Sequence, residues 1–70
     1  MSVARITEIS AGSHKSFDDA IRTGIKRAKE TLHHIHGAWV EDQEVILKEG
    51  AIDEYRVKMK VTFVLDEDKH

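Results

Sequence analysis

Trp39 and Arg56 are the side chains of this sequence best suited to bind a flat or charged small molecule. Trp39 is the only tryptophan, and its indole can stack on a planar ring. Arg56 can donate two parallel hydrogen bonds to a carbonyl or phosphate edge. Both also have a simpler interpretation, because tryptophan is common in subunit interfaces and an arginine can pair with an acid of a neighbouring subunit, such as Glu41, Asp42 or Glu44. The two residues therefore indicate a ligand pocket, a subunit contact or both.

The acids Glu41, Asp42 and Glu44 are also candidate metal ligands, since carboxylate oxygens suit Ca²⁺ and Mg²⁺. The run lacks the spacing of a calcium-binding loop, and neighbouring side chains of a strand point to opposite faces. A cation site would therefore need a symmetry-related chain to complete it. The simpler interpretation is a run of solvated charges.

Histidine chemistry and catalysis find little support in the sequence. His33, His34 and His36 contain no pair four residues apart, the spacing that a zinc site on a helix prefers, and the chain has no cysteine. Histidines near a helix C-terminus interact favourably with the helix dipole, so we interpret them as helix-capping residues. The sequence also lacks a phosphate-binding glycine loop and a nucleophile motif. We therefore predict that the protein is not an enzyme.

A strand and a helix are predicted to precede the candidate site. The segment Val3–Ile9 predicts a short strand, and the Gly- and Ser-rich residues after it predict a loop. Ser16 has the position of an N-cap, and it predicts the start of an amphipathic helix of about five turns that stops at Gly37. The apolar residues at this spacing are Phe17, Ala20, Ile21, Ile25, Ala28, Leu32 and Ile35. Inside the helix, Gly24 predicts a close contact with a neighbour, because glycine otherwise costs about 1 kcal/mol relative to alanine.

A long hairpin is predicted to carry the candidate site. From Ala38 the polarity alternates with period two, which predicts a strand to about Lys48, a turn at Gly50 and a return strand. The alternation fails within Val40–Val45, which predicts a β-bulge, and the charged segment Asp66–His70 predicts a frayed tail. The apolar face of the return strand predicts the core, which consists of Tyr55, Val57, Met59, Val61, Phe63 and Leu65.

The hairpin is also predicted to present an uncovered surface. Strand alternation puts Gly37, Trp39 and Glu41 on one face, and it puts Ala38 and Val40 on the face that packs on the helix. The helix would extend over roughly 28 Å and the return strand over nearly 50 Å. One helix cannot cover that sheet, so we expect other subunits to do so.

Size and charge exclude several kinds of partner. Seventy residues make a single domain, residues 1–70, and without cysteines oligomerisation is the expected source of added stability. Thirteen acidic against eleven basic residues, with no basic block, argue against nucleic acid. Residues 1–10 have one positive charge and no apolar core, and no segment is long enough to span a bilayer. We therefore expect no signal peptide, no membrane partner and a cytoplasmic location.

The chain resembles the dodecin family from Val3 to about Glu67. The resemblance is most specific in the helix segment "RAKETL" and in the strand pattern Y-x-V-x-x-K-V-x-F-x-L, which begins at Tyr55. It implies an α+β fold, a β-α-β-β subunit whose three-stranded antiparallel sheet wraps around one helix. Twelve subunits would form a hollow homododecamer. The family's members are non-enzymatic binding proteins, many of which hold flavins in pairs against a tryptophan and a glutamine.

The residues of this chain match the flavin-binding pattern only in part. Gly37 stands where flavin-binding members have tryptophan, so that Trp39 is displaced by two positions and keeps the same face of the strand. Arg56 replaces the glutamine, and Glu44 and Val45 replace an Arg-Gly pair. The run Trp-Val-x-x-Gln is closer to the group called calcium dodecins.

The resemblance implies a non-enzymatic protein that binds, stores or sequesters a small ligand. The first hypothesis is riboflavin or FMN, with Trp39, Arg56, Gly37 and Glu41 as ligand-binding residues. One alternative is a cation-binding assembly of the same architecture, with calcium or magnesium held by acids among Glu41, Asp42 and Glu44. Another is a structural shell without a ligand.

Overall fold

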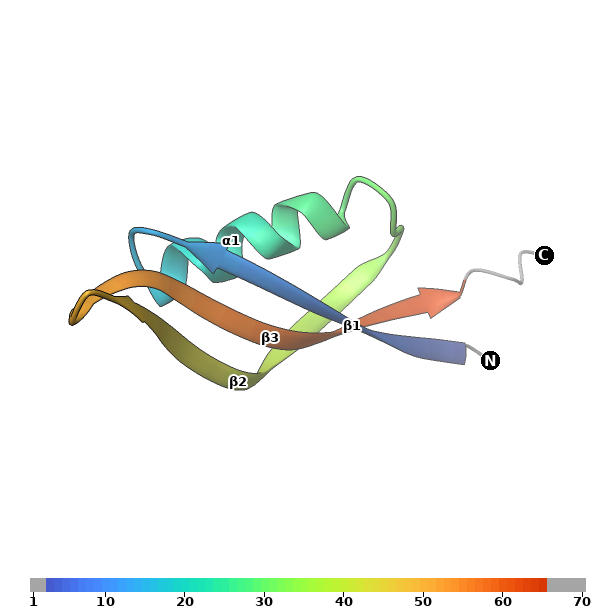
Figure 1. Cartoon of the computed structure of the whole chain (residues 1–70). Coiled ribbons are helices and arrows are strands. Elements are labelled where there is room, and N and C mark those ends of the chain that lie inside the picture. Colours follow the sequence, from blue (N-terminus) through green and yellow to red (C-terminus); the bar gives the residue numbers. More distant parts are fainter. Residues whose placement is uncertain (1–2, 66–70) are drawn as a thin grey trace.

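The fold is a three-stranded antiparallel sheet with one helix across one of its faces (Figure 1). A computed structural model describes residues 3–65, so the predicted tail Asp66–His70 lies outside the described residues. The elements are β1 (Val3–Ser13), α1 (Phe17–Ala28), β2 (Ile35–Lys48) and β3 (Ala51–Leu65), and the strand order in the sheet is β1-β3-β2. This confirms the predicted α+β fold with its β-α-β-β order.

The start of α1 is as predicted, but its end is not. Ser16 has an extended backbone, and its hydroxyl accepts a hydrogen bond of 2.9 Å from the Asp19 amide, which confirms the N-cap. The helix stops at Ala28 after 12 residues, so the prediction of about five turns was wrong. Ile35, which continued the helical spacing, is instead a strand residue paired with Phe63. The spacing of Ile35 fitted both a helix and a strand. Its pairing with the central strand β3 favoured the strand, which also suits a β-branched side chain.

Small residues let α1 approach the sheet closely. Ala20, Gly24 and Ala28 are the buried residues of the helix. A Cβ added at Gly24 would lie 2.7 Å from Met59 Cε and 3.0 Å from Ala11 Cβ. The close contact predicted at Gly24 is therefore confirmed, and it joins the helix to both β1 and β3.

Strand β1 is longer than predicted. It continues through Ser13, where the last pair of its ladder with β3 is Ser13 with Tyr55, so the loop that was expected to begin at Ser10 begins only at His14. Ala11 packs under Gly24 of the helix, and Gly12 lies beside the side chain of Glu54. Ala11 and Gly12 are thus strand residues with close neighbours, Gly24 and Glu54 respectively.

Strand β3 supplies the core, as its alternation predicted. Val57, Met59, Val61 and Phe63 are buried, and the ring of half-buried Tyr55 meets Phe17 edge-on with centroids 5.2 Å apart. The side chain of Leu65, the sixth predicted member, is outside the part that the structure describes. One face of β3 therefore carries the described interior of the subunit.

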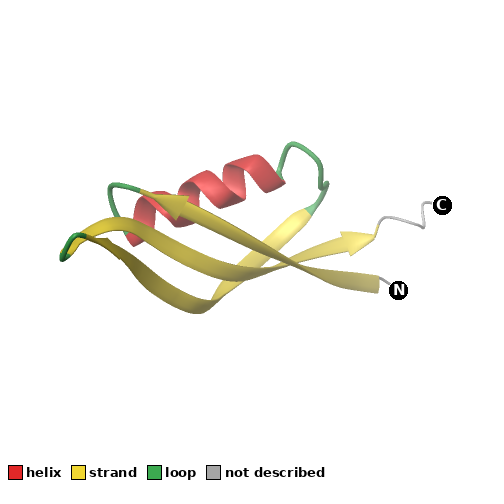
Figure 2. Cartoon of the chain, viewed as in Figure 1, coloured by secondary structure: helices red, strands yellow, loops and turns green. Residues whose placement is uncertain are grey.

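Strand β2 forms the edge of the sheet that the helix leaves uncovered. In Figure 2 the strands extend beyond the shorter helix, and the helix packs against β1 and β3. All β2 residues from His36 to Val45 are exposed, so the predicted packing of Ala38 and Val40 on the helix was wrong. The hairpin turn is at the predicted place, where Glu49 and Gly50 both have positive φ angles of 54° and 82°.

Candidate functional site

A β-bulge in β2 decides which side chains share a face with Trp39. Trp39 pairs with Lys60 and Val40 with Met59, but the next pair is Asp42 with Lys58, which leaves Glu41 as the extra residue. This confirms the predicted bulge. Because directly paired residues point to the same side of the sheet, the bulge turns Asp42 onto the face of Trp39. The expected alternation of the acids between two faces was therefore wrong at this position.

The face of the sheet that points away from α1 carries the candidate residues, and we call it the open face. Trp39 is 49% exposed there, and a Cβ at Gly37 would meet nothing within 4 Å, so the indole has free space beside it. Glu41, at the bulge, makes an ion pair of 3.9 Å with Lys60. The pairing register assigns to the open face Ile6, Glu8, Ser10 and Gly12 of β1, Gly37, Trp39, Asp42 and Glu44 of β2, and Arg56, Lys58, Lys60 and Thr62 of β3.

Trp39 and Arg56 share the open face without being neighbours. Trp39 pairs with Lys60, which is four residues from Arg56 along β3, so the two positions are about 13 Å apart along the strand. Arg56 lines a separate hollow of about 340 Å³ together with Ser10, Asp42, Gln43, Glu44, Val57 and Lys58. Within one subunit, a ligand that touches both Trp39 and Arg56 must span the strip that contains Lys58 and Lys60.

Arg56 has an ion-pair partner that sequence reasoning missed. Its Nη2 donates to Glu54 Oε1 at 3.0 Å, whereas the expected partners were Glu41, Asp42 or Glu44 of another subunit. Glu54 lies two residues away on the same strand, and that spacing puts both side chains on one face. The i, i+2 spacing of opposite charges was the signal in the sequence that could have identified the pair.

Asp42 and Glu44 lie on the open face opposite Lys58 and Arg56 of β3, but they make no ion pair with them. In the described part of the chain neither has an ion-pair partner, since Lys58 pairs with Glu8 at 3.8 Å and Arg56 pairs with Glu54. No group of three acids or histidines among residues 3–65 is placed to hold a metal ion. A cation site at these carboxylates would therefore need ligands from a second subunit.

The histidines do not cap the helix as expected. His33 and His34 lie in the connection after α1, and His36 is an exposed residue of β2. His34 has a left-handed backbone with φ of 60°, which turns the chain toward the sheet. A hollow of about 600 Å³ lies between this connection and the helix end, and its lining includes His33, His34, His36 and Gly37. His14, expected in a surface loop, is exposed, and its ring Nδ1 lies 2.7 Å from the carbonyl oxygen of Asp53.

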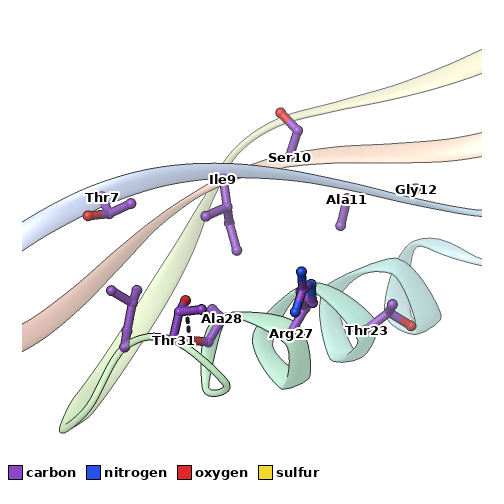
Figure 3. Close-up of a pocket in the computed structure, with 11 residues that line it drawn as sticks. Thr7, Ile9, Ser10, Ala11, Gly12, Thr23, Arg27, Ala28 and Thr31 are labelled. Atoms are coloured by element: carbon purple, nitrogen blue, oxygen red, sulfur yellow. Dashed lines mark hydrogen bonds between the residues drawn. The ribbon is translucent and has the colours of Figure 1, made fainter.

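Residues of β1, of α1 and of the segment after α1 line a further hollow of about 450 Å³ (Figure 3). Ile9, Ala28 and Leu32 provide apolar surface, while Thr23, Arg27 and Thr31 line it from the helix side. This hollow was not predicted from the sequence. Thr23 and Arg27 are four residues apart and therefore lie on one polar stripe of the helix, which was the signal that could have indicated it. The hollow lies on the helix side of the sheet, away from Trp39.

The fold and its sequence can now be compared with known proteins. Residues 3–66 match the family model described as Dodecin. The chain belongs to the dodecin family. Dodecins form homo-oligomers, typically of twelve subunits, and the family binds flavins. A comparison with curated proteins gives no match.

Solved dodecin structures cover nearly the whole chain. The dodecin from Streptomyces davaonensis is 41% identical over 94% of this chain and 97% of its own, with a TM-score of 0.90. A protein from Thermus thermophilus is 28% identical over 97% of this chain and 100% of its own, with a TM-score of 0.91. A calcium dodecin from Mycobacterium tuberculosis, described as having a novel calcium-binding site, is 27% identical over 99% of both chains, with a TM-score of 0.81. These values describe whole chains, so the closer likeness of the second strand to calcium dodecins stays a prediction.

Among the described residues no helix has the length and apolar character needed to cross a membrane.

Proposed function

We propose that the protein is a non-enzymatic, homododecameric dodecin that binds and sequesters a flavin, riboflavin or FMN, at Trp39. The observation that supports this most is the half-exposed indole of Trp39 on the open face, with free space at Gly37 beside it. A flat aromatic ring can stack on that indole and bury apolar surface that the subunit alone leaves in water. The family's flavin binding supports the same ligand class.

The subunit has the surface that a dodecameric shell requires. Strand β2 is an unpaired edge, and exposed apolar side chains lie along the sheet, namely Val3, Ile6, Val40, Val45, Leu47 and Ile52. An exposed strand edge with apolar neighbours is an association surface. In a closed shell, Trp39 would face a symmetry-related copy, and a flavin between two such copies would be shielded from water on both sides.

Cation binding is the second candidate, because the bulge leaves Asp42 and Glu44 together on the open face and neither makes an ion pair among residues 3–65. Two carboxylates are too few for Ca²⁺, which takes six to eight oxygens. Subunits that meet on this face would supply the remaining ligands. The likeness to a calcium dodecin supports this candidate.

Titration of the purified full-length assembly with riboflavin and FMN tests the flavin proposal directly. Because Trp39 is the only tryptophan, its emission reports on that position alone. We expect saturable quenching of Trp39 emission by at least one flavin, and loss of flavin-fluorescence quenching in Trp39→Ala with partial retention in Trp39→Phe. Lys26→Ala is the matched control, since Lys26 is an exposed residue of α1, on the opposite side of the sheet from Trp39.

Native mass spectrometry of the same preparation gives the number of subunits. A colourless preparation whose Trp39 emission is unchanged by either flavin rejects the flavin proposal and leaves the assembly proposal standing. Calcium that raises the melting temperature, with the rise lost on chelation and in the double variant Asp42→Asn, Glu44→Gln, supports the second candidate, because a ligand that binds only the folded assembly stabilises it.

A further inference from the structure

We propose that Glu54 is a positioning residue for Arg56, and that the pair makes the open face prefer flavins without a phosphate group. The inference rests on the proposed flavin function. The pair lies at a place in the sheet where β1 and β3 fit together only because Gly12 has no side chain.

Glu54 occupies the space that a side chain at position 12 would fill. Gly12 pairs directly with Arg56 across the β1–β3 ladder, and a Cβ added at Gly12 would overlap the Glu54 carboxylate. The backbone of Gly12 has no positive φ, so the reason for glycine here is space rather than conformation. Glu54 is correspondingly sheltered, with a side chain 25% exposed against 49% for Arg56.

This placement fixes the direction of the Arg56 guanidinium. Glu54 Oε1 accepts a hydrogen bond of 3.0 Å from Arg56 Nη2, so part of the donor fork is occupied and its charge is balanced locally. The remaining N–H groups of Arg56 can still donate to an uncharged oxygen. A hydroxyl of the ribityl chain or a ring carbonyl suits them, because neither brings a negative charge toward Glu54.

The surroundings of Arg56 oppose a phosphate. Glu44 is the direct cross-strand partner of Arg56 on β2, and Asp42 lines the same hollow. Together with Glu54, three carboxylates lie around one guanidinium, with Lys58 as the other cation of the hollow and already paired with Glu8. A dianionic phosphate that accepted from the remaining N–H groups of Arg56 would approach the carboxylates of Glu54, Asp42 and Glu44, and like charges repel.

The ratio of the riboflavin and FMN dissociation constants tests this inference, measured by Trp39 quenching on the full-length assembly at low and high NaCl. Two variants release Arg56 by different routes: Glu54→Ala removes the carboxylate that accepts from Arg56, and Gly12→Ala removes the space for that carboxylate. For both we expect the ratio to shift toward FMN by about fivefold or more at low salt, and less at high salt. Glu30→Ala is the matched control, with the same charge change at an exposed residue after α1 that does not line this hollow, and should shift the ratio less than about twofold.

Crystal structures of the ligand-free wild type and of both variants provide a second readout that does not need a flavin. The inference expects the guanidinium of Arg56 to contact Glu54 in the wild type and to leave that position in both variants. An unchanged Arg56 position in Glu54→Ala, or a ratio that shifts equally in Glu30→Ala, overturns it. If the wild type binds neither flavin, the proposed function and the flavin preference fall together, while a displaced Arg56 in both variant structures still upholds the positioning role.

Discussion

The two faces of the sheet come from alternate residues of the same strand and have opposite characters. On the face under α1, Val57, Met59 and Val61 are almost completely buried. On the open face, Lys58 and Lys60 of the same strand stay in contact with water beside the half-exposed Trp39. A shift of one residue in pairing would exchange the two sets, so the register of β3 is fixed by burial. The bulge at Glu41 makes such a shift in β2 alone, and it does so next to the candidate site.

The covered face should show the largest effect on stability. Met59 is fully buried and belongs to the core that joins the helix to the sheet, so Met59→Ala should lower the free energy of unfolding by about 2–5 kcal/mol. Lys60→Ala, one residue along on the open face, should change it by less than about 0.5 kcal/mol. Urea unfolding monitored by circular dichroism measures both. Similar losses of unfolding free energy in Met59→Ala and Lys60→Ala would mean that both faces of the sheet are buried, which contradicts the assignment of the interior to the face under α1.

The covered face was also the part that the sequence predicted best. Period-two alternation identified the buried residues of β3, and the N-cap at Ser16 and the turn at Gly50 follow from local chemistry that acts within a few residues. Gly24 was recognised as a contact point because glycine is costly inside a helix. These features depend on burial or on neighbours in the chain, and both leave a pattern in the sequence.

Strand β2 and the open face were predicted less well, because their geometry depends on pairing between distant residues. The spacing of Ile35 fitted a helix, and only its pairing with Phe63 made it a strand residue. A bulge was expected in β2, but its position at Glu41 decides that Asp42 shares a face with Trp39, and this could not be read from alternation. The contact between the Glu54 side chain and Gly12 joins β3 and β1, and no pattern of neighbouring residues in the sequence predicts it.

Assembly provides the next test, since the proposed shell must cover the exposed part of β2. Val40 lies on the helix side of β2 but beyond the cover of the helix. Val40→Lys should leave the subunit folded and weaken the oligomer, at a cost of about 2 kcal/mol or more per subunit for an unpaired ammonium in an interface. Native mass spectrometry and light scattering should show smaller species. Lys26→Glu, a substitution at an exposed position of the helix, is the control. A Val40→Lys protein that assembles as well as the wild type would show that the part of β2 around Val40 stays in contact with water.

A smaller effect is expected where the helix touches the sheet. Gly24→Ala gains helix propensity of about 1 kcal/mol but forces a methyl group against Met59 and Ala11, and such overpacking costs about 1–3 kcal/mol. We expect a net loss of about 1 kcal/mol, measured as a lower urea midpoint. Thr23→Ala, at an exposed position one residue earlier, should be neutral or slightly stabilising. Stabilisation by Gly24→Ala would show that the Met59 side chain can move to make room for the added methyl group, so that the packing of the helix on the sheet does not require glycine at this position.

The smallest effect should come from the side chain of Glu41, the extra residue of the bulge between Val40 and Asp42. Its ion pair with Lys60 is long, at 3.9 Å, and both side chains are more than a third exposed, at 38% and 36%. Water and salt screen such a pair, so Glu41→Gln should change the free energy of unfolding by less than about 0.5 kcal/mol and should reduce its small dependence on NaCl. Since the bulge is a property of strand pairing, Trp39 should keep the same emission maximum in this variant. A loss above about 1 kcal/mol together with a shifted Trp39 emission would mean that the ion pair holds the bulge in place, and that charge rather than register orders the open face.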